Sequence, residues 1–447
     1  MTTEERLQEL EKENAALREA LEKALKELEE WKRGFRERGK RRSSRPEGRK
    51  TSGRGPGRKA GHKGARREVP LQVDRTVEYP PPKRCTCGGA MEATGETRST
   101  RVEDIPPVRV EVTEHVAHVG RCKRCGLEAS EPLPGATSKG ASIALTQVGP
   151  NAAAMAVSLR FDHHVSLGGI AMFLGVWFGL RITSGGVSHL LARQGERAQP
   201  TVEEIASHIR MAPVVGLDET GLRQNGVGGW AWLARTETAS LFRVELSRGA
   251  WVAEQMLGPD FQGTLVTDFY SVYTSHDDWD HGYCGAHMVR EAKKVAECTP
   301  TARTEEFRDR LCAWYVDARK AQTDGDAGTR HGLRSQLGRL IAWGDPRLED
   351  DVQRLQNRLH NHFQGVTAFL DRPEIPADNN GSERDIRIFA RHRKMTGGTR
   401  SPRGSRTLGQ WMSIGQTRRK NGLSLSDFVV RLYETHRYGL PPPSVFN

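Results

Sequence analysis

Apolar residues recur every three to four positions over residues 4–31, EERLQELEKENAALREALEKALKELEEW. This spacing predicts a long helix with a heptad seam, so we expect a coiled coil over 1–31. A buried Asn in the seam favours a two-stranded parallel coil, which makes the chain at least a dimer. A lone charged helix that docks elsewhere is the alternative, because fewer than four heptads are present. The two seam positions hold Leu7, Asn14, Leu21 and Leu28, and Leu10, Leu17, Ala24 and Trp31.

Helical spacing returns over residues 140–208. The stretches ASIALTQVGPNAAAMAVSLR, SLGGIAMFLGVWFG and TSGGVSHLLARQGERA predict short helices joined by Gly-containing turns. They are compatible with a helix-turn-helix fold that binds DNA, and a packing domain without DNA contact fits them equally well. The most apolar run, GGIAMFLGVWFGL, is too short to span a bilayer.

From Ala212 onward, short apolar runs predict strands. APVVGLDETGL, GGWAWLART and ASLFRVELS come first, GAWVAEQMLG predicts a short helix, and GTLVTDFYSVY predicts a fourth strand. This order is typical of a ribonuclease H-like sheet, in which the first and fourth strands lie side by side. Trp230 and Trp232 in the second strand fit packing in the core or at an edge better than base stacking. The fold class is therefore α/β.

Positive charge is concentrated in two blocks of a chain whose net charge is +12. Residues 31–67 hold sixteen Lys or Arg against two Glu, and residues 384–420 hold eleven against Asp385 alone. Two separated basic blocks favour a long polyanion such as nucleic acid, because a Gly/Arg/Ser mixture of this kind does not fold alone and orders on phosphates. A solubilising tail and a solvated helix face are the alternative.

Seven cysteines, an odd number, suit a reduced compartment better than a disulfide framework. Four of them form two close pairs, in RCTCGG and RCKRCG, as expected of a zinc ribbon with a tetrahedral thiolate site. The segment between them, RVEVTEHVAHVG, alternates like a strand. Reduced structural cysteines are the alternative, and His115 and His118 fit ordinary strand residues better than ligands. The predicted zinc ligands are Cys85, Cys87, Cys122 and Cys125.

Two aspartates end the first and fourth predicted strands, in VVGLDET and TLVTDFY. If these strands are neighbours, Asp218 and Asp268 come together, and two buried like charges are too costly without a cation. The pair therefore predicts a divalent metal site. Two unrelated turn or cap aspartates are the alternative.

The stretch PADNNGSERDIRIFARHRK supplies a candidate third carboxylate among arginines. On a helix beginning near Gly381, Glu383 shares one face with Ile386 and Ala390, while Asp385 lies about 200° around the helix. Asp378 precedes the helix and suits a cap or turn. Asp218, Asp268 and Glu383 together would hold two Mg²⁺ ions about 4 Å apart and act on a phosphodiester.

These motifs together resemble the transposases of the insertion sequence 66 family. The matching stretches are PGRKAGHKG, the two cysteine pairs, LDET, TDFYSVY, YCGAHMVRE and DNNGSERDIR, which run nearly end to end. The CTC pair departs from the more usual two-residue spacing, which affects the finger's metal and not the catalysis. The resemblance implies that Asp218, Asp268 and Glu383 are the catalytic triad. It also places Cys284 and His287 near the active site without settling their role, since a second zinc site would need a companion pair.

The resemblance implies a transposase that cleaves DNA at element ends and joins the freed 3′ hydroxyl to target DNA. Expected cofactors are Mg²⁺, with Mn²⁺ as the alternative, and structural Zn²⁺. Expected partners are DNA, a second copy of the chain through the coil, and candidate accessory proteins encoded by the element. The alternatives are a ribonuclease H-like nuclease without strand transfer and a non-catalytic zipper and zinc DNA-binding regulator. Predicted DNA contacts are Arg384, Arg387, Arg391, Lys394, Arg290, Lys59 and Lys63.

The N-terminus, MTTEERLQELEKEN, does not read as a secretion signal, so we expect a cytoplasmic, nucleoid-associated protein. No membrane partner is expected. The predicted domains are a coiled coil (1–31), a basic linker (32–70), a zinc-finger-like domain (71–135), a helical domain (140–208), a catalytic domain (212–420) with a helical insertion at about 292–371, and a C-terminal helix and tail (421–447).

Overall fold

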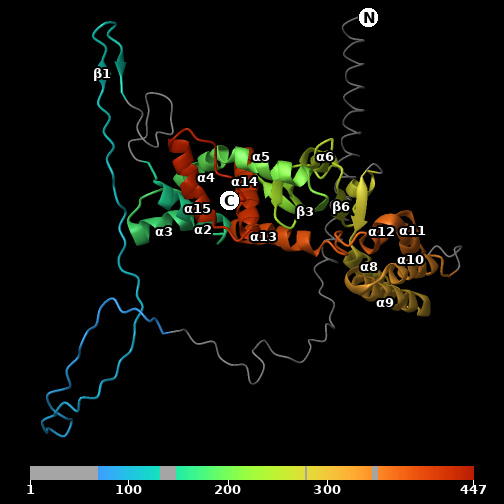
Figure 1. The fold of residues 1–447 in the computed structure, drawn as a ribbon, viewed down its shortest axis with the longest axis horizontal. Helices are drawn as coiled ribbons and strands as arrows, with labels where there is room; N and C mark the ends of the chain where they lie inside the picture. The colour runs from blue at the N-terminus through green and yellow to red at the C-terminus, as the bar shows by residue number, and fades with distance from the viewer. Residues whose placement is uncertain (1–68, 131–146, 277–278, 345–350) are drawn as a thin grey trace, which may run out of the picture. The chain divides into compact units, whose positions relative to one another are not determined.

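The computed structural model describes residues 69–130, 147–276, 279–344 and 351–447 (Figure 1). The predicted coiled coil over 1–31 and most of the basic linker lie outside these ranges. The chain divides into two compact units, Met1–Ile105 and Pro106–Asn447. No helix of the described ranges has the length and apolar content needed to cross a membrane.

A tight turn at Cys85 is the main feature in the described part of the first unit, where no helix or strand is present. The amide of Gly88 donates to the carbonyl of Cys85 over 2.8 Å, and the amide of Cys85 donates to the carbonyl of Gly89 over 2.8 Å. Gly88 has a φ of 90°, in the left-handed region that favours glycine. Cys85 and Cys87 therefore lie on one short turn.

The second unit begins with a small hairpin of β1 (Gly120–Arg121) and β2 (Glu128–Ala129). The predicted strand over Arg109–Gly120 is wrong, because only its last residue belongs to a strand. No sheet or helix of the described ranges covers its alternating valines, and Val112 and Val116 are 87% and 67% exposed. An apolar alternation forms a strand only where another element pairs with it and buries one face.

A five-stranded sheet lies at the centre of the second unit, with the strand order β5-β4-β3-β6-β7. β3 pairs antiparallel with β4, which pairs antiparallel with β5, whereas β6 pairs parallel with β3 and with β7. The prediction that the first and fourth strands are neighbours is confirmed, and β7 is an addition to it. The strands are β3 (Val214–Gln224), β4 (Val227–Arg235), β5 (Ser240–Glu245), β6 (Thr264–Thr267) and β7 (Asp280–Tyr283).

The prediction that the first strand ends at Asp218 is wrong, because β3 continues to Gln224. The long hairpin with β4 extends it, and Asp218 is paired with Leu233 of β4. On its other side, β3 pairs with β6 only as far as Gly216. Asp218 therefore still lies where β6 ends beside it, although it is in the middle of its own strand.

Helices that precede the sheet in the chain, a helix between its strands and helices that follow it share one hydrophobic core with the sheet. Trp411 of α14 lies fully buried and its indole N–H donates to the carbonyl of Leu191 over 3.0 Å. α14 approaches β5 closely at Gly409, where a Cβ would lie 2.9 Å from the carbonyl oxygen of Phe242. The helices are α2 (Pro150–Phe161), α3 (Leu167–Phe178), α4 (Ser184–Arg197), α5 (Gln199–Arg210), α6 (Trp251–Leu257), α13 (Asn380–Thr396), α14 (Pro402–Lys420) and α15 (Leu425–Arg437).

A second hydrophobic core lies among the helices between β7 and α13. Phe307, Trp314 and Phe369 are its largest fully buried side chains, each at most 2% exposed. α12 packs against β7, which ties these helices to the sheet (Figure 1). The elements are α8 (Gly285–Cys298), α9 (Ala302–Asp324), α10 (Ala327–Ile341), α11 (Asp351–Asn361) and α12 (Phe363–Asp371), and the short α7 (Ser271–Thr274) follows β6.

Candidate active site

Asp218 and Asp268 are brought together by the parallel pairing of β3 and β6. Asp268 directly follows the last residue of β6, and its carboxylate accepts a hydrogen bond from the amide of Tyr270 over 2.9 Å. The carboxylate of Asp218 accepts a hydrogen bond from the amide of Glu219 over 2.8 Å. Backbone groups thus hold both carboxylates at the point where β6 ends beside β3.

Asp218 is buried and lies in the field of several other carboxylates. Burial raises the pKa of Asp218 to about 7, and the nearby negative charges of Glu219, Asp268 and Glu383 add to the rise. Because like charges at close range oppose each other's ionisation, this cluster is unfavourable when every member is charged. A bound cation would relieve that repulsion.

Glu383 reaches the cluster from the first turn of α13. One of its carboxylate oxygens lies 3.6 Å from Nε2 of His287 and 3.5 Å from Nη2 of Arg290, both on α8. Nδ1 of His287 is buried and has no hydrogen-bond partner among the described residues. The third predicted acid is therefore flanked by an imidazole and a guanidinium group.

The residues present fit a divalent cation by charge and ligand type, since oxygen ligands suit Mg²⁺ and Mn²⁺. Asp218, Asp268 and Glu383 are the side chains that could hold it. Their side chains are not arranged as a coordination shell, because no group of three or more His, Cys, Asp or Glu in the described ranges is positioned around a common point. The structure therefore shows a concentration of carboxylates and not a formed metal site.

The start of α13 packs closely against β3 at Gly216, where a larger residue would not fit. Asn379 donates from its side chain to the carbonyl of Leu217 over 2.9 Å, next to Asp218. A Cβ on Gly216 would collide with Oγ of Ser382 and lie 3.3 Å from Oδ1 of Asn379. Glycine at position 216 thus allows α13 to sit directly against the strand that carries Asp218.

Cys284 contributes to the same clamp. It is fully buried, and its sulfur accepts a hydrogen bond from the amide of Asn379 over 3.1 Å. Beside it, the amide of Gly285 donates to the carbonyl of Ala377 over 3.0 Å, and the hydroxyl of Tyr315 donates to the same oxygen over 3.2 Å. The two ends of the Cys-x-x-His motif therefore have different contacts. Cys284 binds the residue that precedes α13, and His287 lies beside Glu383.

The other two acids of the DNNGSERDIR region have different partners. Asp378 accepts a hydrogen bond from the amide of Asn380 over 3.0 Å, a turn of the kind predicted for it. Asp385 accepts hydrogen bonds from Arg235 over 3.1 Å and from Ser240 over 2.9 Å, and it pairs with Lys420 over 2.6 Å. Neither side chain shares the hydrogen-bond or ion-pair partners given above for Glu383.

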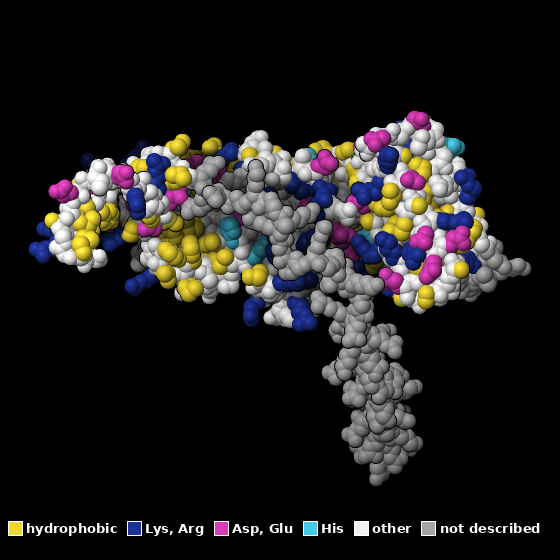
Figure 2. Space-filling model, turned by 90° about the horizontal axis from the view of Figure 1, so that it is seen from below, with side chains coloured by type: hydrophobic (Ala, Val, Ile, Leu, Met, Phe, Trp, Pro, Cys, Tyr) yellow, Lys and Arg dark blue, Asp and Glu magenta, His cyan; other side chains and the backbone are white. Residues whose placement is uncertain are grey.

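The predicted DNA contacts of α13 are all exposed. Figure 2 shows Lys and Arg side chains gathered in several groups on one face of the molecule, mixed with acidic side chains over the part that carries α8–α12. Arg393 is used internally, because its guanidinium donates to the carbonyl of Gly221 in β3. Lys59 and Lys63 lie outside the described residues. The exposed residues are Arg290, Arg384, Arg387, Arg391 and Lys394.

Each predicted zinc-binding pair lies on its own tight turn. All four cysteines are free and exposed. The amide of Cys122 donates to the carbonyl of Leu127 over 2.8 Å, which closes a turn like that at Cys85. Hydrogen bonds from the backbone of Cys87 lower the pKa of the Cys85 thiol, and those from the backbone of Cys125 lower the pKa of Cys122. Both turns therefore favour the thiolate that binds zinc.

Sequence reasoning missed the residues that surround Glu219. This buried carboxylate follows Asp218 directly in the LDET motif and binds the hydroxyl of Tyr273 and the guanidinium of Arg248. The position of Glu219 beside Asp218 was visible in the sequence. Its partners lie far along the chain, and no local pattern indicates them.

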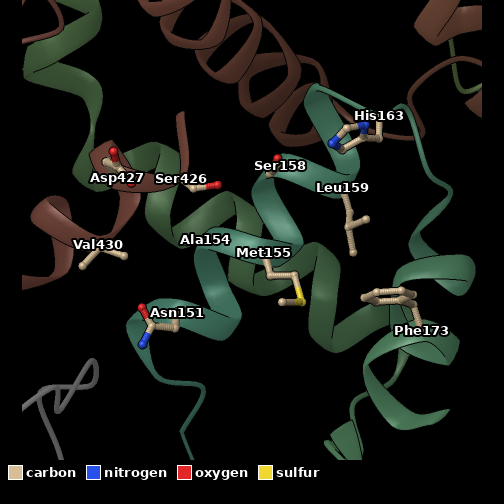
Figure 3. Close-up of a pocket in the computed structure, with 10 residues that line it drawn as sticks. All are labelled: Asn151, Ala154, Met155, Ser158, Leu159, His163, Phe173, Ser426, Asp427 and Val430. Atoms are coloured by element: carbon tan, nitrogen blue, oxygen red, sulfur yellow. The ribbon is translucent and has the colours of Figure 1, made fainter. Parts of the chain in front are cut away.

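A cavity of about 380 Å³ lies between α2, α3 and α15 and is not lined by Asp218, Asp268 or Glu383 (Figure 3). Met155, Leu159 and Phe173 give it an apolar wall, and Asp427 and Ser426 line its opposite side (Figure 3). None of the predicted site residues that the structure describes lines this cavity.

Comparison with protein families gives two matches along the chain. The family described as "Transposase IS66 family" matches residues 146–407, which include Asp218, Asp268 and Glu383. The "zinc-finger binding domain of transposase IS66" matches residues 82–126, which include both cysteine pairs.

Two curated relatives come from Sinorhizobium fredii (strain NBRC 101917 / NGR234). Uncharacterized protein y4jO is 27% identical over 152 residues, which cover 34% of this chain and 47% of that protein. Uncharacterized protein y4jD is 25% identical over 394 residues, which cover 79% of this chain and 75% of that protein. The match thus spans about half the length of the first relative and three quarters of the second.

Proposed function

The chain belongs to the IS66 family of transposases, and from this premise we propose that it cleaves DNA at the ends of an insertion sequence and transfers the freed strand into target DNA. The observation that carries the proposal is the parallel pairing of β3 and β6, which brings Asp218 and Asp268 together where β6 ends, with the negative charge of Glu383 acting on Asp218 from α13. A regulator that only binds DNA would gain nothing from gathering these charges, since the repulsion opposes folding.

The sheet supports a ribonuclease H-like catalytic core. Its order, β5-β4-β3-β6-β7, combines an antiparallel half with a parallel half, and the two aspartates lie where β3 and β6 run side by side. The helices α8–α12 stand between the second and third acids in the chain, as a helical insertion would. The remaining predicted domains keep their proposed boundaries, with DNA recognition assigned to the zinc-finger domain and pairing of two chains to the coiled coil.

Within this core, the carboxylates of Asp218, Asp268 and Glu383 would hold two divalent ions, Mg²⁺ or Mn²⁺. When bound, such ions supply activation of the attacking oxygen and stabilisation of the leaving 3′ oxygen. The contacts of Asn379 and Cys284 hold α13 so that Glu383 stays beside the aspartates. His287 and Arg290 position the Glu383 carboxylate from α8.

The exposed arginines of α13 and Arg290 of α8 would bind the DNA backbone. They lie on the helices that carry Glu383 and its neighbours, so phosphates bound there run past the carboxylates. Guanidinium groups suit this task because they bind phosphate oxygens with paired hydrogen bonds. Zinc bound by Cys85, Cys87, Cys122 and Cys125 would fold the finger, and the whole protein would act in the cytoplasm on chromosomal and element DNA.

A strand-transfer assay separates this function from that of a simple nuclease. Duplex DNA containing the genomic sequences that flank the reading frame, labelled at internal nucleotides on the reading-frame side of each end, is incubated with the full chain, Mg²⁺ or Mn²⁺ and a supercoiled plasmid. We expect metal-dependent cleavage and covalent transfer of the label to the plasmid. Cleavage without transfer would favour the nuclease, and binding without cleavage would favour the regulator.

A further inference from the structure

The loop between β5 and α6, residues 246–250, is fixed by several hydrogen bonds. The indole of Trp232 donates to the carbonyl of Ser247 over 3.2 Å, and the hydroxyl of Tyr270 donates to the carbonyl of Arg248 over 3.4 Å. The amide of Gly249 donates to the hydroxyl of Ser247 over 3.0 Å. The backbone that carries Arg248 is therefore anchored to β4 and to the segment that follows Asp268.

The side chain of Arg248 is held on three sides. Its guanidinium carbon lies 3.8 Å from the ring centroid of Tyr270 and 4.3 Å from that of Trp230. Nε donates to Oε1 of Glu219 over 3.0 Å, and a second guanidinium nitrogen binds the same oxygen. The other oxygen of Glu219 accepts the hydroxyl hydrogen of Tyr273. Two rings and a carboxylate thus fix the plane of one guanidinium group.

This arrangement leaves part of Arg248 available. A guanidinium group carries five N–H donors, and the bonds to Glu219 use two of them. The Glu219 side chain is 4% exposed, whereas 38% of the Arg248 side chain remains accessible to solvent. The remaining donors are therefore pre-oriented at the surface, and no large loss of side-chain entropy is needed to use them.

The position of Arg248 relates it to the acids. Glu219 follows Asp218 in β3, and its charge acts directly on Asp218. Tyr270, which packs on Arg248, donates its amide hydrogen to Asp268. Arg248 is therefore one contact away from each of the two aspartates that the sheet brings together.

We propose that Arg248 binds a backbone phosphate of the DNA strand undergoing cleavage, on the β5–α6 side of the carboxylate cluster. The proposal rests on the proposed function. It adds a phosphate contact from the β5–α6 loop to those proposed for the arginines of α8 and α13. Glu219 has a positioning role, since it fixes the guanidinium plane and takes no part in holding the ions. Arg248 covers one face of Tyr270 and one face of Trp230, and its own charge and N–H donors suit a phosphate as ligand.

Arg243 is a matched control for this proposal. Its side chain is also 38% exposed, it pairs with Glu245 over 2.7 Å, and its guanidinium lies 5.9 Å from the ring of Trp251. It lacks a link to Asp218 or Asp268 among the contacts described above. Arg243→Ala therefore removes a similar exposed arginine and ion pair without removing the proposed contact.

The test combines variants of the protein with single neutral phosphates in the DNA. Methylphosphonate groups, which lack the phosphate charge, are placed one at a time around the cleavage position of a flank-sequence duplex. Cleavage rates are measured for the wild type, Arg248→Ala, Arg248→Lys and Arg243→Ala. Binding is measured by fluorescence anisotropy in the background of the Glu383→Gln variant, so that one readout does not depend on cleavage.

We expect Arg248→Ala to lower the cleavage rate about tenfold to a hundredfold, the effect of losing one hydrogen bond to a charged group. Arg248→Lys should restore part of it, and Arg243→Ala should cleave at the wild-type rate. At one phosphate, the methylphosphonate should weaken cleavage and binding by proteins that keep Arg248. The same methylphosphonate should have little further effect on proteins that carry Arg248→Ala. A merely structural arginine would not produce this coupling.

Two results would overturn the role of Arg248 and leave the proposed function intact. One is cleavage by Arg248→Ala at the wild-type rate while Glu383→Gln is inactive. The other is that the losses caused by Arg248→Ala and by methylphosphonate simply add at every phosphate. Cleavage by Glu383→Gln at the wild-type rate would instead overturn the proposed function. Thermal unfolding of Arg248→Ala serves as a check on folding. If that variant is destabilised, the comparison of Arg248→Lys with the wild type at each methylphosphonate decides the question in the same way.

Discussion

Nζ of Lys420 lies 2.6 Å from Oδ2 of Asp385, two positions along α13 from Glu383. Both side chains are largely buried, and Arg235 and Ser240 bind the same carboxylate. Burial lowers the pKa of Lys420 to about 8, so its ammonium depends on the nearby carboxylate to remain charged. The two acids of the SERD sequence therefore have different partners, since Asp385 ties α13 to α14 and β4 while Glu383 lies beside His287 and Arg290 of α8.

Asp385→Asn should lower the free energy of unfolding by about 3 kcal/mol, because it leaves two buried cations without their carboxylate. Urea unfolding at pH 7 measures this loss. Cleavage per folded molecule should stay near that of the wild type, in contrast to Glu383→Gln. An unfolding free energy equal to that of the wild type would show that the buried ion pairs add no net stability.

Gly216→Ala should impair cleavage more than it impairs folding. The added methyl group would collide with Ser382 and press on Asn379, which moves the start of α13 away from β3 and displaces Glu383. We expect a loss of about 1–3 kcal/mol in stability and a fall in cleavage of about tenfold to a hundredfold. Gly228→Ala is the control, since its added Cβ would meet nothing within 4 Å. Equal cleavage by both variants would contradict the clamp.

The buried pair of His164 and His392 should make stability depend on pH. Their Nδ1 atoms lie 3.3 Å apart, and burial, Arg160 and His164 lower the pKa of His392 to about 3. An unfolded His titrates near 6.5, so this contribution to stability is complete above pH 6.5 and is lost as the pH falls toward 3. The loss amounts to about 2 kcal/mol between pH 6.5 and pH 5.

His392→Phe tests this contribution and keeps a ring beside Phe161, which is stacked on His392 at 6.0 Å. The comparison uses the slope of unfolding free energy against pH from 7.5 to 5, because the variant also alters packing. We expect a flatter slope for the variant. Parallel slopes would mean that His392 is protonated as easily in the folded chain as in the unfolded one.

Zinc should be bound by the two cysteine turns together. Cys122→Ser should reduce the zinc content of the purified full chain from about one ion per chain to almost none, since a structural site needs four ligands. Cys298→Ser, which changes another exposed cysteine, should leave the content unchanged. Elemental analysis after dialysis gives the answer. Full retention of zinc by Cys122→Ser would remove this residue from the proposed site.

The sequence predicted the features that depend on local pattern and simple geometry. Apolar runs located β3 and β6 and the acids at their edge, and the helical period separated Glu383 from Asp385. The ends of elements were less accurate, because the length of β3 is set by its pairing with β4 and not by its own residues.

Features that depend on distant partners could not be predicted from local pattern. Arg248 and Glu219 are twenty-nine positions apart, and each alone reads as an ordinary surface residue. The strand predicted over Arg109–Gly120 was wrong for the opposite reason. Its pattern is that of a strand, but within the described part of the chain no element covers its valines. A sequence pattern records what a segment can bury, and the rest of the fold decides whether it is buried.

The most direct test of the central claim is the rate at which the Glu383→Gln variant cleaves the flank-sequence duplex in Mg²⁺ or Mn²⁺. Glu374→Gln, a change of an exposed carboxylate near the same helix, is the control, and anisotropy confirms that each variant binds the duplex. We expect Glu383→Gln to bind as well as the wild type and to show no detectable cleavage or joining in either metal, while Glu374→Gln retains both. Cleavage by Glu383→Gln at the wild-type rate would contradict the assignment of Asp218, Asp268 and Glu383 as the catalytic carboxylates.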